Sequence, residues 1–409
     1  MDEIIEKVEQ LSLKYTNSTD KAHLKKNGQF FTVDKDLLER LLDDYAWGSN
    51  TSILEPSCGS GTIIAECIRA ADSKYKIKGM DIEECLVEST REIFKGYDNV
   101  EILKGNFLNA AFDEKFDLIV GNPPYFEMSL DEEQRKEFKD IICGRANIYA
   151  LFIYKSIKLM KEGGELRFII PRTILSGKYF SKLREYIHEK CDVIDIVKFN
   201  KSNMFKKALQ SVIILKLRKT TKSRAGNVIK LDGKVYFAKN EEKLVIENST
   251  SIKSLGCRVK TGSIEWNKNK ELLRSELAED TLPLVMASNL KDGHLVLGGS
   301  THASYAKKQY MKVTKENEKQ VQYGPCIYVN RIVGLDPVRL NVVLEKSVEK
   351  KFFVENHVNV INGELSKLEI IERSLREEFT KEFLNELLGS TQISQYELEC
   401  IVPIKGEIR

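Results

Sequence analysis

The chain has 409 residues, of which 42% are hydrophobic and 31% are charged, and this balance excludes a disordered chain and, at this length, predicts two folded domains. The eight cysteines form no CxxC or Cys/His cluster, which argues against a zinc site and a disulfide framework, so no metal is expected. No apolar run approaches the ~20 residues that span a bilayer, and the charged, amphipathic N-terminus is not a signal peptide, so a cytoplasmic protein without membrane contact is predicted.

The first predicted elements are two amphipathic helices, because apolar residues recur there at helical spacing: Ile4, Ile5, Val8 and Leu11, and then Leu37, Leu38, Leu41 and Leu42. The string Gly28-Gln29-Phe30-Phe31-Thr32 lies between them. Thr32 or Asp34 is a suitable N-cap for the second helix, and the free N–H groups of a helix start can hold a carboxylate. An ordinary loop with a helix cap is the alternative interpretation.

A strand, a glycine-bearing turn and a helix come next. The strand begins at Thr51, the turn carries Glu55-Pro56-Ser57-Cys58-Gly59-Ser60-Gly61, and the helix covers residues 63–71. Glycines in such a turn let the backbone approach a ligand closely. The string has neither the Gly-Lys-Ser/Thr ending of a P-loop nor the GxGxxG pattern, so it is not a phosphate-binding turn of either kind.

The next two predicted strands each end in a candidate ligand. The strand from Lys76 ends at Asp81, about twenty residues past the glycine turn, the spacing at which a carboxylate reaches a pair of ribose hydroxyls. The strand that begins at Val100 ends in Gly105-Asn106-Phe107. A surface helix cap at Asp81 and a core position for Phe107 are the alternatives.

The fourth strand, Leu118 to Val120, ends at Gly121-Asn122-Pro123-Pro124-Tyr125. The two prolines stop the strand and stiffen its end, so Asn122 is presented where ligands bind in open α/β sheets. The amide oxygen of Asn122 and the carbonyl of Pro123 can accept both hydrogens of a planar exocyclic amine, while the ring of Tyr125 stacks on the flat group that carries it. A tight turn after a buried strand is the alternative.

Further along, helices are predicted over residues 147–160, 179–188 and 365–388, and strands over residues 165–171, 193–199 and 211–217. Gly163-Gly164 is expected to separate the first of these helices from the first of these strands. The stretch 220–227 is polar and aperiodic, which favours a domain boundary near it.

Two of these strings resemble a known family, the amino-methyltransferases that use S-adenosyl-L-methionine. Residues 122–125 match its Asn-Pro-Pro-Tyr motif, and residues 55–61 match its Glu-Pro-x-x-Gly-x-Gly motif. The segment from Gly28 to Thr32 resembles the N-terminal motif of its gamma-class, TaqI-methylase-like members, which are type II adenine-N6 DNA methyltransferases. The resemblance implies an α/β fold: a Rossmann-like methyltransferase domain with a mixed, mostly parallel sheet over residues 1–222, and a smaller α+β target-recognition domain over residues 223–409.

The resemblance also implies residue roles. The catalytic set is Asn122, Pro123, Pro124, Tyr125 and, as the second stacking ring for an extruded adenine, Phe205. The cofactor-binding set is Phe31, Thr32, Glu55, Pro56, Gly59, Gly61, Asp81, Asn106, Phe107 and Asn122. The family usually has Asp where this chain has Asn106, and an amide oxygen can still accept the bond from the cofactor's adenine.

A basic stretch follows the predicted catalytic sheet. Between Asp195 and Asp232 no acidic residue occurs while Lys and Arg recur, which is typical of a surface that binds a phosphate backbone. A solvated, lysine-rich linker is the alternative. The candidate DNA contacts are Lys206, Lys207, Lys260, Thr261 and Arg331.

The implied activity is methyl transfer to the N6 amino group of adenine in double-stranded DNA after base flipping, by a monomer, with a restriction endonuclease of the same system as a candidate second partner. RNA adenine, a glutamine side chain of a protein, and a binding module without catalysis are the alternatives. Cytosine-C5 chemistry is disfavoured because the Pro-Cys pair, Pro325-Cys326, lies outside the predicted cofactor domain.

Overall fold

The structure is a computed structural model that describes residues 2–19, 35–71, 74–199, 212–222, 226–231, 233–297, 308–334, 337–388 and 391–405. Five of the predicted site residues lie outside this part of the chain: Phe31, Thr32, Phe205, Lys206 and Lys207. The chain divides into two compact units, Met1–Asn240 and Glu241–Arg409.

The first unit is built on a seven-stranded sheet in the order β3-β2-β1-β4-β7-β9-β8. Its strands are β1 (Thr51–Glu55), β2 (Tyr75–Asp81), β3 (Val100–Lys104), β4 (Phe116–Gly121), β7 (Met160–Pro171), β8 (Cys191–Lys198) and β9 (Val212–Lys219). Strand β9 pairs antiparallel with both of its neighbours, and the other pairs are parallel. This mixed, mostly parallel sheet confirms the predicted Rossmann-like α/β fold.

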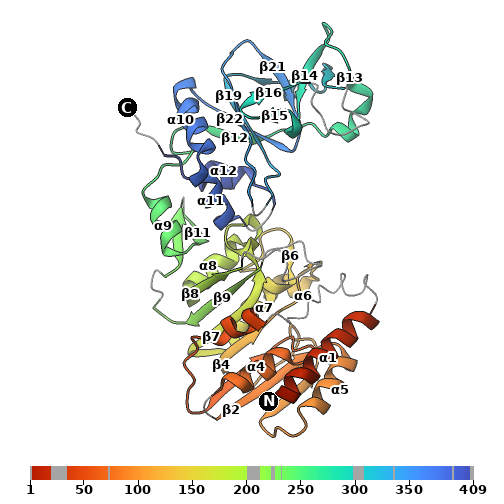
Figure 1. The fold of residues 1–409 in the computed structure, drawn as a ribbon, viewed down its shortest axis with the longest axis vertical. Helices are drawn as coiled ribbons and strands as arrows, with labels where there is room; N and C mark the ends of the chain where they lie inside the picture. The colour runs from red at the N-terminus through yellow and green to blue at the C-terminus, as the bar shows by residue number, and fades with distance from the viewer. Residues whose placement is uncertain are drawn as a thin grey trace. The chain divides into compact units, whose positions relative to one another are not determined.

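Helices cover both faces of this sheet (Figure 1). On one face lie α1 (Asp2–Ser18), α3 (Lys35–Leu42), α4 (Thr62–Ala70) and α5 (Glu84–Ile93), around a core that includes Val8, Leu41 and Ile64. On the other face lie α7 (Ile148–Leu159) and α8 (Ser181–Lys190). The short α6 (Glu132–Glu137) lies between β5 (Glu127–Met128) and β6 (Ala146–Asn147) in the chain. The two helices predicted near the N-terminus are confirmed, and all four leucines of α3 are buried.

Strand β7 differs from its prediction. It begins at Met160 and continues through Gly163-Gly164, where the sequence pattern predicts a break. The pairing of β7 with β4 shifts register between Phe116 and Leu118, and Gly163 has a φ of 78°. Because glycine takes a positive φ without steric cost, the extra residues bulge out and the strand continues.

A hairpin follows the sequence-based boundary at residue 222. It consists of β10 (Val228–Leu231) and β11 (Lys234–Phe237), and its Val228, Val235 and Phe237 side chains pack in the same core as α7 and α8. The first compact unit therefore extends to Asn240.

The second unit combines sheets with helices, as an α+β domain does. Its two larger sheets have the orders β12-β22-β19-β20 and β13-β17-β14-β21-β18. The first contains β12 (Arg258–Thr261), β22 (Val358–Asn362), β19 (Cys326–Asn330) and β20 (Val342–Glu345); the second contains β13 (Leu273–Arg274), β17 (Tyr310–Lys312), β14 (Thr281–Val285), β21 (Lys351–Val354) and β18 (Gln322–Tyr323). The chain from Asn240 onward also forms a two-stranded ribbon, β15 (Leu290–Lys291) with β16 (His294–Leu295), and the helices α9 (Asn240–Glu247) and α12 (Gln395–Cys400).

The helix predicted over residues 365–388 is two helices, α10 (Leu365–Arg376) and α11 (Glu378–Leu387), so that prediction is wrong in this detail. The residue between them, Glu377, has extended backbone angles. The carbonyl of the buried Ser374 accepts hydrogen bonds from the backbone N–H of Glu377 and the hydroxyl of Thr380. These bonds end the first helix without a glycine or proline that the sequence pattern would reveal. Within the described residues, no helix is both long and apolar enough to cross a membrane.

Candidate functional site

A cavity of about 350 Å³ lies at the carboxyl ends of β1, β2, β3 and β4. The order of the sheet reverses at β1, which pairs with β2 on one side and β4 on the other. This reversal is the topological switch point at which open α/β sheets bind ligands. Eight of the predicted site residues line the cavity: Glu55, Pro56, Gly59, Asp81, Asn106, Phe107, Asn122 and Pro124.

The glycine turn after β1 forms one wall of the cavity. Gly59 and Gly61 have φ angles of 49° and 84°, which glycine adopts at no steric cost. A Cβ atom on Gly61 would lie 2.5 Å from Cε2 of Phe94. A side chain at position 61 is therefore disfavoured both by the positive φ and by the contact with Phe94. Gly61 itself is not among the lining residues; it caps α4 and places that helix behind the turn.

Asp81 connects the glycine turn to the end of β2 by a hydrogen bond. Its Oδ2 accepts a hydrogen bond of 2.8 Å from the N–H of Gly59, and its Oδ1 accepts one of 2.9 Å from the N–H of Glu83. The hydroxyl of Thr90 donates to the carbonyl of Gly59 from the other side, at 2.9 Å. Burial raises the pKa of Asp81, and the two backbone N–H bonds oppose that rise.

Glu55 lies deeper, at the end of β1, with 2% of its surface exposed. Its Oε2 atom is buried and has no hydrogen-bond partner in the described part of the chain. Burial, followed by the negative charge of Asp81, raises the pKa of Glu55 well above its usual value. No group of three or more His, Cys, Asp or Glu among the described residues is arranged to hold a metal.

The turn after β3 forms a second, aromatic wall. Oδ1 of Asn106 accepts the N–H of Leu108 at 3.0 Å, and the ring of Phe107 packs against that of Phe152 with centroids 4.9 Å apart. Lys155 of α7 donates to the carbonyls of Leu108 and Ala110 at 2.8 and 2.6 Å. This lysine therefore fixes the turn from behind, a role that no sequence pattern indicates.

Asn122 enters the cavity from the end of β4. The hydroxyl of Ser57 in the glycine turn donates to the Asn122 carbonyl at 3.3 Å, so the two motifs are joined directly. The hydroxyl of Tyr125 lies within hydrogen-bond distance of two acceptors, Oδ1 of Asn122 and the carbonyl of Ile169, the latter at 2.8 Å, and its single hydrogen can be donated to either. Burial raises the pKa of Tyr125, so its phenol stays neutral.

Pro123 and Tyr125 adjoin the cavity but are not among the residues that line it. The lining instead includes Phe126, Met128 and Gln134 from the segment that follows the Asn-Pro-Pro-Tyr string. Of these, only Phe126 carries a sequence signal, as an aromatic residue directly after the string. Met128 and Gln134 are positioned by the β5–α6 segment, which sequence periodicity does not reveal.

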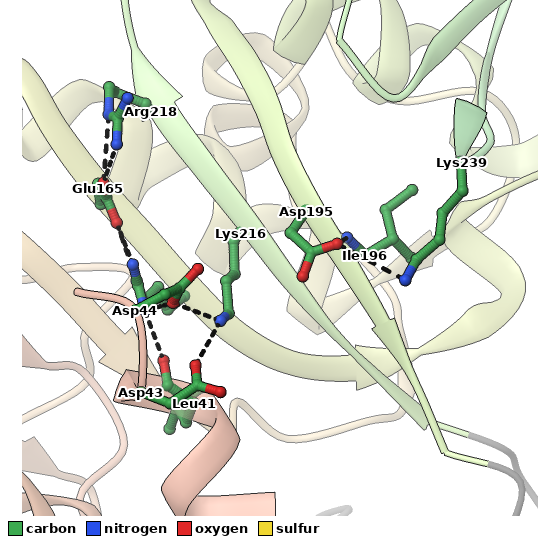
Figure 2. Close-up of polar contacts among 10 residues, drawn as sticks. Leu41, Asp43, Asp44, Glu165, Asp195, Ile196, Lys216, Arg218 and Lys239 are labelled. Carbon is green, nitrogen blue, oxygen red and sulfur yellow. Dashed lines mark hydrogen bonds and ion pairs between the residues drawn. The ribbon is translucent and has the colours of Figure 1, made fainter.

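Lys216 of the basic stretch is buried and therefore not available to a phosphate backbone, which corrects the prediction at this residue. Lys216 is 2% exposed and pairs with Asp43 at 3.1 Å and Asp44 at 2.6 Å. Arg218 pairs with Glu165 at 2.7 Å (Figure 2). The sequence interval contains no acid, but Asp43 and Asp44, which directly follow α3, and Glu165 of β7 pair with these cations in the folded chain.

Glu165 also pairs with Arg167, at 2.7 Å, and Arg167 in turn pairs with Asp44 at 2.6 Å. Arg167 is 1% exposed and additionally donates to the carbonyl of Leu41. These pairs connect β7 and β9 to the end of α3 (Figure 2). The network is structural, because none of its members lines the cavity.

The candidate DNA contacts of the second unit lie towards one end of the sheet that contains β12. Lys260 is exposed on that strand, and Thr261 donates to Oδ1 of Asn359 on β22 at 2.9 Å. Arg331 follows β19 and donates to the carbonyl of Asn356 at 2.8 Å. Asn359 on β22 is the partner of Thr261 on β12 and of Val329 on β19. Because Arg331 comes shortly after Val329 in the chain, Thr261 and Arg331 lie at the same end of the sheet.

Residues 10–205 match the family model described as Eco57I restriction-modification methylase. Over 392 residues the chain is 26% identical to the type II methyltransferase M.CvrRI of Paramecium bursaria Chlorella virus XZ-6E, covering 95% of this chain and 96% of that protein. It is 29% identical over 406 residues to the modification methylase CviBIII of Paramecium bursaria Chlorella virus NC1A, and this match covers 97% of this chain and 99% of that protein. A solved structure described as a putative class I S-adenosylmethionine-dependent methyltransferase from Listeria monocytogenes is 22% identical, with a TM-score of 0.44, over 54% of this chain and 68% of that one.

Proposed function

We propose, from the match of residues 10–205 to the Eco57I restriction-modification methylase model, that the protein transfers a methyl group from S-adenosyl-L-methionine to the N6 amino group of adenine in double-stranded DNA. The observation that carries the proposal is that Asn122 and the glycine turn at Gly59 line one cavity. The Asn122 amide, which accepts a hydrogen bond from the exocyclic amine in the proposed reaction, therefore lies in the same cavity as the glycine turn beside which the methyl donor binds.

The chemistry of the cavity fits this cofactor. Its charged lining residues are acids, Glu55, Asp81 and Glu83, and no described lining residue is Lys, Arg or His. Such a site disfavours phosphates and suits a nucleoside that carries positive charge. Asp81 would hold the ribose hydroxyls, Phe107 would pack on the adenine with Asn106 beside it, and Glu55 would face the ammonium group of the amino-acid end.

When bound, the cofactor supplies an activated methyl group on a sulfonium. The lone pair of the adenine N6 atom is delocalised into the ring, which makes the nitrogen a poor nucleophile. Asn122 Oδ1 and the Pro123 carbonyl accept its two N–H bonds, so the nitrogen pyramidalises and its lone pair points at the methyl carbon. The amine would take the methyl group that the cofactor supplies, with the sulfur as the leaving group, and the surplus proton would leave the nitrogen for solvent. Positioning and oriented dipoles provide the acceleration.

The base reaches Asn122 by base flipping, which costs a few kcal/mol. Stacking on the ring of Tyr125 offsets part of this cost, with Phe205 as the second ring. The segment 223–409 acts as the target-recognition domain, and Lys260, Thr261 and Arg331 are its candidate contacts. We infer that the protein acts as a monomer, and that a restriction endonuclease of the same system is a second partner.

Transfer of a radioactive methyl group distinguishes the candidate acceptors. Purified protein is incubated with tritiated S-adenosylmethionine and, separately, with unmethylated duplex DNA, RNA, or a peptide containing the release-factor glutamine. The proposal predicts label in DNA alone. Label in RNA or peptide with none in DNA overturns it. The nearly full-length match to a type II methyltransferase and to a modification methylase supports the expectation of DNA.

A further inference from the structure

The cofactor cavity contains an acidic pair without a counter-ion among its described lining residues. Glu55 and Asp81 lie on its β1 and β2 sides, and Glu83 is the third charged residue of the lining. Both carboxylate oxygens of Asp81 accept backbone N–H groups. Glu55 differs, because its Oε2 is buried and has no partner among the described residues. A buried, unpaired carboxylate is strongly disfavoured, whereas a neutral carboxylic acid is tolerated.

The groups that face Glu55 all favour its neutral form, apart from one backbone contact. Burial is the largest cause of its raised pKa, and the charge of Asp81 is the second; the backbone of Ile64 in α4 acts in the opposite direction. The nearby thiols, Cys58 in the turn and Cys67 in α4, also have pKa values raised by burial and therefore supply no positive or negative charge at neutral pH. The described lining of the cavity thus contains no cation that would stabilise a Glu55 carboxylate.

We propose that Glu55 is protonated in the free protein and gives up its proton when the positively charged cofactor enters the cavity, so that cofactor binding releases a proton to solvent. The carboxylic acid becomes a carboxylate that faces the cation, and the O–H proton passes to the buffer, so charge and atoms balance. This inference rests on the proposed function, because it takes S-adenosylmethionine as the ligand.

Because cofactor binding is coupled to the loss of this proton, the affinity for the cofactor increases as the pH rises. Below the pKa of Glu55 in the free protein, each bound cofactor must displace a proton, so affinity rises by up to about tenfold per pH unit. Above that pKa the carboxylate is already formed and the affinity levels off. The site therefore selects charged ligands and binds them better in neutral than in acidic solution.

Calorimetry measures the released proton directly. The cofactor is titrated into the full-length protein at pH 6.5, in two buffers with different heats of ionisation. The wild-type protein is expected to show a heat of binding that depends on the buffer, because the released proton is taken up by it. Glu55→Gln mimics the neutral acid and should lose this release, while Glu83→Gln, a carboxyl removed from the same lining, should retain it.

An infrared difference spectrum of the wild-type protein gives a second readout that needs no variant. Cofactor binding should remove the carbonyl band of a protonated carboxylic acid and produce a carboxylate band. Heats that are independent of the buffer, an unchanged acid band, or full proton release in Glu55→Gln would each overturn the inference while leaving the proposed function intact. Failure of the wild-type protein to bind the cofactor at all contradicts the proposed function instead.

Discussion

The hydroxyl of Tyr125 donates a hydrogen bond to the amide oxygen of Asn122, and it also faces the carbonyl of Ile169 on β7. The phenol therefore joins the end of β4 to the neighbouring strand and fixes the orientation of the amide. In the proposed reaction this amide must be aligned with the amine to which it is hydrogen-bonded. The hydroxyl of Tyr125 therefore orients Asn122, while its ring has the separate function of stacking on the base.

Replacing Tyr125 by Phe is expected to slow methyl transfer by about fivefold to tenfold, because loss of one hydrogen bond costs on the order of 1 kcal/mol. Tyr125→Ala should slow it further, since the ring that we propose to stack on the flipped base is also lost. Single-turnover transfer rates measure both effects, with cofactor affinity as the control. A Tyr125→Phe rate equal to the wild-type rate would show that the hydroxyl does not orient Asn122.

The glycine turn gives a stability prediction. Gly61→Ala places a Cβ atom 2.5 Å from the ring of Phe94 at a φ of 84°, and strain of this kind costs about 1–3 kcal/mol. The free energy of unfolding in urea should fall by that amount. Gly96→Ala is the matched control, because its Cβ would meet no atom within 4 Å. Equal stability of the two variants would contradict the packing described for the turn.

The ion-pair network around Glu165 is expected to matter for folding. Glu165→Gln removes the buried one of the two carboxylates that pair with Arg167, which is 1% exposed, and loss of one partner of a buried pair costs up to about 3–5 kcal/mol. Lys7→Ala breaks an exposed pair with Glu3 and should change stability by less than about 1 kcal/mol. Urea unfolding compares the two, and a Glu165→Gln effect as small as that of Lys7→Ala would count against a structural role for the network.

Asp44 gives the network a defined acid sensitivity. Burial raises the pKa of Asp44, but the hydrogen bond from Lys216 and the charges of Arg167 and Lys216 outweigh it and lower the value from 3.8 to about 2. A carboxyl whose pKa is lowered on folding stabilises the protein above its unfolded pKa, and that stability is lost as the pH falls through the folded value. In Asp44→Asn, the fall in unfolding free energy between pH 4 and pH 2 should therefore be smaller than in the wild type. An unchanged pH profile would contradict this assignment.

The elements that hold the cavity are largely predictable from the sequence, because β1, β2 and β4 are short apolar runs that end in glycine, proline or a lone acid. What the sequence does not reveal depends on residues far apart in the chain. One partner of the Tyr125 hydroxyl is a carbonyl on β7, and the acids that pair with Lys216 directly follow α3. The break before α11 has no glycine or proline, and the continuation of β7 depends on one backbone angle at Gly163.

Analysis of the methylated nucleosides tests the central claim most directly. Duplex DNA is treated with the wild-type protein or with Asn122→Ala, digested, and examined by mass spectrometry, while cofactor affinity is measured on the same preparations. The account predicts N6-methyladenine with the wild type, a loss of at least about a hundredfold in Asn122→Ala, and cofactor affinity within a few-fold of wild type. N4-methylcytosine as the product, or loss of cofactor binding together with activity in Asn122→Ala, would contradict it.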